Sequence, residues 1–377
     1  MIELKEICKV QCGFAFDSKK FTEDSSYYPL IRIRDVKRGF TQTYYTGEFS
    51  SEYIVHKGDL LVGMDGEFNI ARWNSDDALL NQRVCRIITN NNTNEEYLRF
   101  YLKRTLKLIE SKTSFVTVKH LSAKELNSLK LNLPCIEDQQ RISKQLSTLE
   151  LMIRKNKQVL ELLDELVKAR FVEMFGDPIQ NSKGYPIRQF SDYIISLTSG
   201  SRGWAKYCVD DGKEWFITIK NVKDCHIITD NIQPIDAPSN AEAKRTKVEE
   251  GDLLISITAD LGRTGVVTKE VAEHGAYINQ HLSCIRIDRE ILNPLYVAYY
   301  MESPAGKRQF MQKNQSAVKA GLNFNSINSL KLLVPPMEEQ NKFIRFVKQI
   351  DKSRSRIQKS LEASQELFDS LMQEYFG

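Results

Sequence analysis

Basic and amide side chains are the residues of this sequence whose chemistry is most informative. The planar fork of arginine donates two parallel hydrogen bonds to a phosphate or to guanine, and asparagine and glutamine can match adenine in the same way. Such residues fall in predicted strands and turns, where we predict contacts to DNA. The predicted positions are Arg32, Arg34, Lys37, Arg38, Arg72, Asn81, Gln82, Lys220, Asn221, Lys223, Arg263 and Lys319.

Each of these positions has an alternative interpretation, because an exposed arginine or lysine is most often solvated surface. Residues 262–265 (GRTG) place Arg263 in a glycine-flanked loop, and Arg72 with Trp73 is expected near the equivalent place in the first half. The pair Asn81-Gln82 recurs as Asn279-Gln280. Recurrence in otherwise different surroundings favours a turn or a buried network over base reading.

Catalytic patterns give no nucleophile or general base to predict. The glycine–lysine pairs at 212–213 and 306–307 lack the first glycine of a phosphate-binding loop. Residues 293–296 (NPLY) resemble the Asn-Pro-Pro-Tyr motif of amino methyltransferases but lack its second proline, so we interpret them as a helix start. The seven cysteines are scattered, with only Cys8 and Cys12 close together, which argues against zinc and favours a reducing cytoplasm.

Length and composition indicate two domains and little else. The chain has 377 residues, of which 41% are hydrophobic and 27% charged, enough for two separate cores. Fifty-three basic and 49 acidic residues leave a net charge of +4, which is uninformative because local patches are hidden in the total. We expect neither a membrane span nor a signal peptide from the sequence pattern.

The chain repeats itself. Residues 55–62 (VHKGDLLV) match 248–255 (VEEGDLLI), and residues 30–36 (LIRIRDV) match 216–222 (FITIKNV). From Leu121 onwards the two copies align without a gap, until Phe175-Gly176 matches Phe376-Gly377. The sequence therefore predicts two copies of one module, each a variable globular part followed by a more constant tail.

Both tails are predicted as long helices with a heptad seam. Each begins just after a proline, with acidic residues in the first turn, and the first is expected to span Ile136–Met174. The two could pair antiparallel; the alternative is that each packs on its own domain. The predicted seam residues are Ile142, Leu146, Leu149, Ile153, Leu160, Leu163, Val167, Val347, Ile350, Ile357, Leu361, Phe368 and Leu371, with polar gaps at Asn156, Arg170, Arg354 and Ser364.

The globular parts are predicted to be α+β. Ile31 and Ile33 alternate with arginines, as Ile217 and Ile219 do with polar residues, which favours strands. Helices are expected over 95–112 and 294–312, and residues 122–125 (SAKE) have the form of a capping box. We expect helices attached to a compact sheet that could close into a barrel.

The arrangement of two variable parts, each followed by a long helix, resembles that of a known family. The helices are introduced by Leu133–Gln139 (LPCIEDQ) and Val334–Gln340 (VPPMEEQ), and the first ends in MFGD followed by NSKGYP. This double arrangement is similar to the specificity subunit of type I restriction–modification systems. The resemblance covers the whole chain. Cys135 replaces the second proline of the first entry motif, which leaves the local packing open.

The resemblance implies target recognition domains at 1–132 and 177–333, and conserved helices at 133–176 and 334–377. It also implies that each domain reads one half of a split DNA target, while the helices set the spacing and dock two methyltransferase subunits. S-adenosylmethionine, ATP and Mg would then belong to the modification and restriction subunits, with no cofactor, metal or catalytic residue on this cytoplasmic chain. The alternatives are a coiled-coil scaffold without DNA specificity and an enzyme with an unrecognised site.

Overall fold

The computed structural model describes residues 1–66, 68–112, 120–314 and 321–377 and divides into two compact units. Unit 1 holds residues 1–158 and 358–377, and unit 2 holds residues 159–357. The helices α5 (Ile136–Phe175) and α11 (Met337–Phe376) have 40 residues each, and each contributes to both units. The predicted first helix is thus confirmed to within one residue at its end.

Unit 1 contains two main open sheets, in the strand orders β2-β10-β7-β8 and β3-β5-β4-β9-β6. Its strands are β1 (Ile2–Glu3), β2 (Cys8–Cys12), β3 (Phe21–Thr22), β4 (Tyr28–Ile31), β5 (Tyr44–Tyr45), β6 (Ile54–Val55), β7 (Leu60–Gly63), β8 (Asn69–Arg72), β9 (Ala78–Leu80), β10 (Val84–Thr89) and β11 (Lys130–Leu131). Its other helices are α1 (Leu4–Ile7), η1 (Ser18–Lys20), α2 (Ile33–Arg38), η2 (Ser51–Tyr53), α3 (Glu95–Lys112) and α4 (Ala123–Asn127).

Strand β7 shows why its sequence is continuously apolar. Leu60 and Val62 belong to the core beneath α3, whereas Leu61 points to the other face, in a cluster with Ile31 and Leu80 of the second sheet. Successive side chains of a strand point to opposite faces, so a strand covered on both sides has no polar position. The four-stranded sheet is therefore the middle layer between helix α3 and the second sheet.

Unit 2 repeats this layering with two more strands in the first sheet and two fewer in the second, in the orders β13-β21-β18-β19-β16-β15 and β17-β14-β20. Its strands are β12 (Ile187–Gln189), β13 (Ile194–Ser199), β14 (Glu214–Ile217), β15 (Val222–Lys223), β16 (Cys225–Ile227), β17 (Gln233–Ile235), β18 (Leu253–Ser256), β19 (Thr264–Val266), β20 (Ala276–Ile278), β21 (Leu282–Ile287) and β22 (Lys331–Leu333). Its other helices are η3 (Phe190–Tyr193), η4 (Trp204–Tyr207), η5 (Ile219–Asn221), α6 (Ala241–Thr246), α7 (Lys269–His274), α8 (Pro294–Glu302), α9 (Pro304–Lys313) and α10 (Phe324–Asn328).

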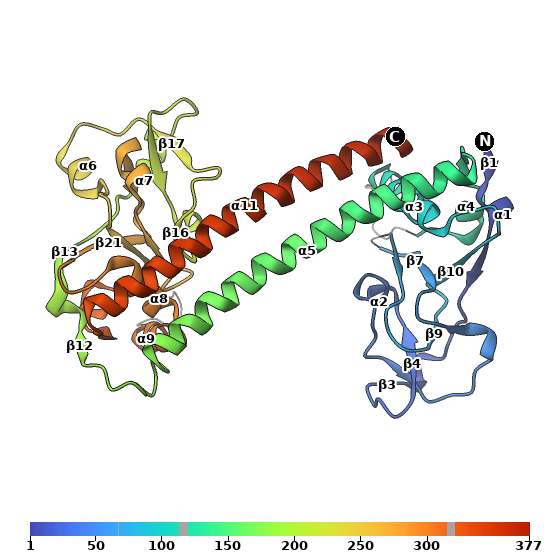
Figure 1. The fold of residues 1–377 in the computed structure, drawn as a ribbon, viewed down its shortest axis with the longest axis horizontal. Helices are drawn as coiled ribbons and strands as arrows, with labels where there is room; N and C mark the ends of the chain where they lie inside the picture. Colours follow the sequence, from blue (N-terminus) through green and yellow to red (C-terminus); the bar gives the residue numbers. More distant parts are fainter. Residues whose placement is uncertain (67, 113–119, 315–320) are drawn as a thin grey trace. The chain divides into compact units, whose positions relative to one another are not determined.

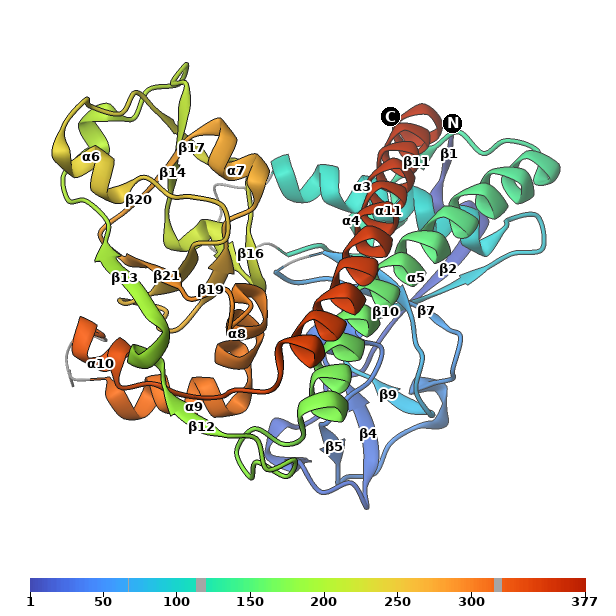
Figure 2. The ribbon, with the colours of Figure 1, turned by 60° about the vertical axis from the view of Figure 1, so that its left-hand side comes forward.

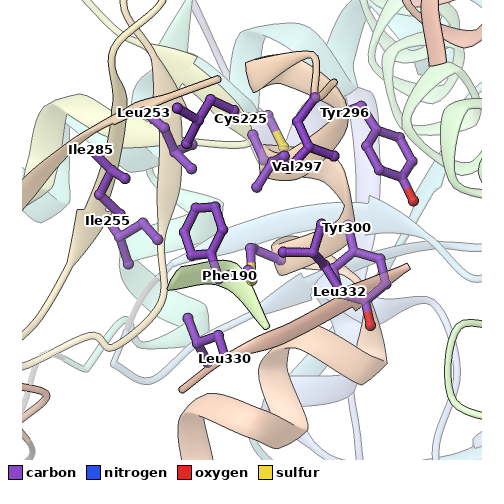
Figure 3. Close-up of a cluster of buried hydrophobic side chains, with 14 of the residues drawn as sticks. Phe190, Cys225, Leu253, Ile255, Ile285, Tyr296, Val297, Tyr300, Leu330 and Leu332 are labelled. Carbon is purple, nitrogen blue, oxygen red and sulfur yellow. The ribbon is translucent and has the colours of Figure 1, made fainter. Parts of the chain in front are cut away.

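The main core of unit 2 lies between the six-stranded sheet and helix α8. Figure 3 shows Leu253, Ile255 and Ile285 of the sheet facing Val297 and Tyr296 of the helix across this core. Leu254, which lies between Leu253 and Ile255, faces the other sheet instead. The α+β prediction is confirmed, and in the described residues no sheet closes on itself, so each module has two packed open sheets and not the barrel that the sequence left possible.

The long helices pack antiparallel within each unit. In unit 1, Gln145 Oε1 accepts a hydrogen bond from Tyr375 Oη at 3.1 Å, and Asn156 Nδ2 donates to Ser360 Oγ at 3.2 Å. The partner residue number falls as the first number rises, which is the signature of antiparallel packing. Seam residues Ile142, Leu146, Ile153 and Phe368 are buried, while Leu149, Leu361 and Leu371 are half-buried. Figure 1 shows the two helices side by side.

In unit 2 the same pairing is carried by other residues. Arg354 pairs with Asp164, and the rings of Phe171 and Phe343 meet edge to face with their centroids 5.4 Å apart. The predicted residues Val167, Val347 and Ile350 are buried, and Leu160, Leu163 and Ile357 are half-buried. The buried Phe171 takes the place that the predicted pattern gave to Arg170, which is only half-buried.

Each helix pairs with the other helix and also packs on its own domain. The start of α5 does so where Ile142 clusters with Phe100 of α3, and the start of α11 where the rings of Phe343 and Tyr299 of α8 lie 5.3 Å apart. The far end of each helix packs on the domain of the other copy, with Phe368 of α11 6.0 Å from Phe100 and Phe175 of α5 4.9 Å from Tyr296 between ring centroids. Each seam is therefore partly filled by side chains from the globular part.

Two predictions of secondary structure are wrong. The first copy's strand ends at Ile31, and Ile33 begins helix α2, because the Asp35 carboxylate accepts a hydrogen bond from Arg32 N at 2.8 Å and caps the turn. In the second copy Ile219 likewise begins η5. The helix expected over 294–312 is broken into α8 and α9 at Ser303 and Pro304, since proline has no N–H to donate to the preceding turn (Figure 2).

Among the described residues, no helix is both long enough and apolar enough to span a lipid bilayer.

Candidate nucleic-acid interface

The arginines of the first copy lie where strand β4 passes into helix α2. Asp35 is buried, and its carboxylate also accepts a hydrogen bond from Thr41 Oγ1 at 3.0 Å, while Gly39 ends the helix with φ of 78°. Arg32 and Arg34 are exposed on this turn, and Arg34 Nε lies 3.7 Å from the Asp35 carboxylate. Lys37 and Arg38 follow in the last turn of α2 and are also exposed.

Arg32 and Arg34 line one open groove of unit 1. The other residues of this groove come from β3 and from the segment before β5, and they are Phe21, Thr22, Glu23, Gln42, Thr43 and Tyr44. Two guanidinium groups can hold phosphate or guanine, the Gln42 amide can match adenine, and the Glu23 carboxylate can accept from cytosine. The groove therefore gathers the donor and acceptor types that base edges require.

The groove contains two residues that the sequence analysis missed, Gln42 and Tyr44. Both flank Thr43, which is buried and holds the guanidinium of Arg34 at 3.5 Å from its hydroxyl. A run of three polar residues followed by two tyrosines over 41–45 (TQTYY) was the available signal. It could not be connected to Arg32 and Arg34 without knowing that β5 pairs with β4.

The second copy places different residues on the same framework. Thr218 stands where Arg32 stands, and the buried Asn221 takes the capping role of Asp35, accepting from Thr218 N at 3.0 Å. The Asn221 amide also donates to Ile228 O at 3.2 Å, so its hydrogen bonds hold the fold and do not leave it available as a DNA contact. Lys220 and Lys223 are exposed, with Lys223 Nζ 3.8 Å from the Asp224 carboxylate.

Arg72 serves the interior of unit 1. Its guanidinium donates to Glu96 at 2.5 Å and to Gly58 O at 2.7 Å, which ties β8 to the start of α3. Burial raises the pKa of Glu96, but the charges of Arg99 and Arg72 outweigh burial and lower it below its ordinary value. These contacts give Arg72 a structural role, and its adjacent Trp73 is buried.

Arg263 lies in the turn between β18 and β19. Ser256 Oγ accepts a hydrogen bond from Arg263 N at 2.8 Å, and the guanidinium pairs with Asp260 beside it. The strand register shows that Arg72 is not its counterpart, because Arg72 lies opposite Leu60 and Val266 lies opposite Leu253. Arg72 therefore corresponds to Val266, at the far end of the strand. Lys319 lies outside the described residues.

The recurring Asn-Gln pair is a turn in both copies, as the alternative interpretation held. Asn81 O accepts from Val84 N at 2.8 Å, and Asn279 O accepts from Leu282 N at 3.1 Å. A side chain at Gly13 would come within 2.2 Å of Leu80 O, and one at Gly200 within 2.0 Å of Asn279 O. This close approach requires glycine in both copies, and the sequence alone gave no sign of it.

A partly buried ion pair recurs in the two units. Arg86 Nη1 lies 2.9 Å from the Asp59 carboxylate in unit 1, and Arg286 Nε lies 3.0 Å from that of Asp252 in unit 2. Both aspartates follow the recurring glycine and also cap their own turns. The framework is thus held by the same chemistry twice. Among the described residues, no cluster of three or more His, Cys, Asp or Glu could hold a metal ion.

Comparison with protein families gives one match over most of the chain. The family model described as "Type I restriction modification DNA specificity domain" matches residues 1–165 and 214–365. The chain is 29% identical to the EcoBI type I restriction enzyme specificity subunit of Escherichia coli, over 96% of this chain and 81% of that protein. It is 18% identical to the MjaVIII specificity subunit of Methanocaldococcus jannaschii, over 87% and 80%.

Solved structures are similar over the whole chain. The type I restriction–modification S subunit from M. genitalium has a TM-score of 0.65 and 12% identity, with 100% of this chain and 95% of that chain covered. A structure from a study of the assembly and conformational transition of the type I R-M system has a TM-score of 0.52 and 17% identity, with 100% and 96% covered. At these identities the likeness shows the fold alone.

Proposed function

Because the chain belongs to the family of type I restriction modification DNA specificity domains, we propose that it is the DNA sequence-recognition subunit of a type I restriction–modification complex. Each globular domain reads one half of a bipartite DNA target. The observation that carries this proposal is the pair of equivalent turns after β4 and β14, which share a capped backbone but present Arg32 and Arg34 in one copy and Thr218 and Lys220 in the other. One scaffold with two sets of exposed side chains suits two different half-sites.

The long helices act as spacer and docking surface. At about 1.5 Å per residue, a helix the length of α5 extends roughly 60 Å, enough to set the gap between two half-sites. On the part of α5 that lies in unit 2, the side chains of Leu162, Leu166 and Val172 are about half exposed. Such exposed apolar side chains support the docking of a partner. Adding or removing one turn within α5 should change the gap in the methylated sequence and leave the half-site bases unchanged; altered bases would contradict the spacer role.

The partners follow from this role. We assign double-stranded DNA, two methyltransferase (modification) subunits and a restriction/translocase subunit as partners, with S-adenosylmethionine, ATP and Mg on those subunits and none on this chain. The chain contributes recognition and no catalytic residue. All seven cysteines are free thiols, which supports action in the reducing cytoplasm.

The test is to co-express the full chain with the modification subunits of its own system and to map methylated bases in the host DNA. We expect one bipartite motif that disappears when this chain is omitted. The alternative, a coiled-coil scaffold without DNA specificity, predicts that methylation does not depend on this chain and that the complex shows no salt-dependent DNA affinity.

A further inference from the structure

Two cysteines of unit 1 lie directly opposite each other on neighbouring antiparallel strands. Cys12 ends the edge strand β2, and Cys85 is its partner on β10. Gly13 N donates to Val84 O at 3.0 Å, which makes the next pair along the ladder a hydrogen-bonded one. Because hydrogen-bonded and non-hydrogen-bonded pairs alternate, Cys12 and Cys85 form a non-hydrogen-bonded pair.

This position has the geometry of a disulfide. Partners in a non-hydrogen-bonded pair have Cα atoms about 4.5 Å apart, inside the range of roughly 4.4–6.8 Å that a disulfide spans. Their side chains project from the same face of the sheet. Cys85 is fully buried in the core under α3, with its Sγ 3.1 Å from Met64 Sδ, and Cys12 is half-buried at the edge of the same core.

The two thiols are chemically unequal. The neighbouring Cys85 thiol lowers the pKa of Cys12 from its ordinary value, against the opposing effect of burial. The interaction with Cys12, together with burial, raises the pKa of Cys85. Cys12 is also the more exposed of the two thiols, so an oxidant from solvent reaches its sulfur first, and Cys85 lies buried beside it.

The second copy provides an internal comparison. Ser199 of β13 lies opposite Ser283 of β21, and Gly200 N donates to Leu282 O at 3.1 Å, as Gly13 N does to Val84 O. The backbone register is therefore the same at both places, and the side chains differ by sulfur against oxygen. Only the first copy can form a covalent bond across this pair.

We propose that Cys12 and Cys85 are a site of reversible oxidation that forms a cross-strand disulfide with hydrogen peroxide as the oxidant. The Cys12 thiolate attacks one peroxide oxygen, forming an S–O bond as the O–O bond breaks and the released hydroxide takes up a proton to become water. Cys85 then attacks the Cys12 sulfur, forming the S–S bond as the S–O bond breaks, and its proton leaves with the hydroxyl as a second water. Two thiols lose two electrons, and the peroxide gains them.

The disulfide would close a loop that contains the whole groove of Arg32, Arg34 and Gln42. It would also tie the edge strand β2 to the sheet beside Gly13, where the chain passes close to the Asn81 turn. A cross-link across so long a loop restricts the unfolded chain. We therefore expect the oxidised protein to show slower hydrogen exchange in unit 1 and unchanged exchange in unit 2.

The experiment treats the reduced full chain with hydrogen peroxide and maps peptides under non-reducing conditions. We expect the protein to lose two of its seven free thiols and to yield a Cys12–Cys85 peptide pair about 2 Da lighter than the two thiol peptides together. Dithiothreitol should restore both thiols. Oxidation of Cys12 to a sulfinic acid, or its cross-linking to any other cysteine while Cys85 stays a thiol, would overturn the proposal.

Matched variants separate this site from general cysteine oxidation. Cys12→Ser should abolish the cross-link, whereas Cys8→Ser, on the same strand, should leave it intact. The double variant Ser199→Cys with Ser283→Cys should gain a second cross-link under the same treatment. Its failure to do so, while Cys12 and Cys85 cross-link, would overturn the argument that strand register is what brings the sulfurs together.

Discussion

The two copies of the module keep their interior chemistry and change what they expose. The Asp59–Arg86 pair has its equivalent in Asp252–Arg286, and the glycine that approaches the Asn-Gln turn recurs as well. The capped turn after β4 carries arginines, but the matching turn after β14 carries threonine and lysine. This contrast indicates that the scaffold tolerates new surface residues, because the buried caps Asp35 and Asn221 fix its turns.

The largest expected effect concerns specificity. Exchanging residues 1–132 for the recognition domain of a related chain should replace one half-site of the methylated sequence completely and leave the other half-site unchanged. The reason is that the groove of unit 1 is built from residues of that segment alone. Methylome sequencing measures both halves at once, and a change in both would contradict the independence of the copies.

The next effect compares the aspartates of the two ion pairs, Asp59 and Asp252. Asp252 is fully buried, whereas the Asp59 side chain is 28% exposed, so water can replace part of its pairing. Asp252→Ala should lower the free energy of unfolding more than Asp59→Ala, with both losses on the order of 1–3 kcal/mol. Asp252→Ala removes the acceptor of Glu249 N, while Arg286 keeps the Glu249 carboxylate at 3.0 Å as a partner.

Hydrogen exchange resolved by unit measures this difference. Each variant should loosen only its own unit, so each protein carries its own control. Equal losses for the two variants would show that burial does not distinguish the two pairs.

A smaller effect is expected for the exposed cations. Arg34→Ala should weaken DNA binding by about 1–3 kcal/mol and relax one position of a half-site if it reads a base, or weaken all sequences alike if it contacts phosphate. Lys220→Ala should reduce affinity less and lower the salt dependence by about one charge. Fluorescence anisotropy over a salt series separates these outcomes.

Arg141→Ala is the control for this comparison, because Arg141 is exposed in the second turn of α5 and pairs with Asp138 at 2.9 Å. It should bind DNA as the unchanged protein does. If Arg34→Ala and Lys220→Ala also leave binding unchanged, both side chains are ordinary surface.

The smallest effect is a pH dependence confined to unit 2. His226 lies on β16, a strand without a counterpart in the four-stranded sheet of unit 1, and its Nε2 is 3.2 Å from the Asp351 carboxylate of α11. Burial opposes the charged ring and Arg354 repels it. The hydrogen bond and charge of Asp351, with a hydrogen bond to Asp224 O, outweigh both and raise the pKa of His226.

A raised folded-state pKa means that this pairing stabilises unit 2 fully below the ordinary value of 6.5 and that the stabilisation is lost as pH rises through the raised value. His226→Gln should remove this part of the pH dependence of unfolding, and Asp351→Asn should do the same. Thermal unfolding across neutral pH measures it, and an unchanged profile in both variants would contradict the role of the pair.

The features that the sequence determined are those encoded by neighbours in the chain. The 40-residue helices follow from a repeated apolar spacing, and the duplicated framework follows from matching segments such as 55–62 and 248–255. The Ser122 capping box formed as predicted, because its partners are three residues apart. Local periodicity and short-range hydrogen bonds require no knowledge of the tertiary fold.

Only the tertiary structure decided the roles of single polar residues. The Arg72 guanidinium donates to Glu96 on helix α3, and the Asn221 amide donates to Ile228 O. Gln42 lines the same groove as Arg32 because strands β4 and β5 pair. An arginine or asparagine has the same hydrogen-bonding groups whether it holds the fold or faces DNA. Which of these it does depends on the partners that distant segments bring to it, and those partners are fixed only when the sheets and helices pack.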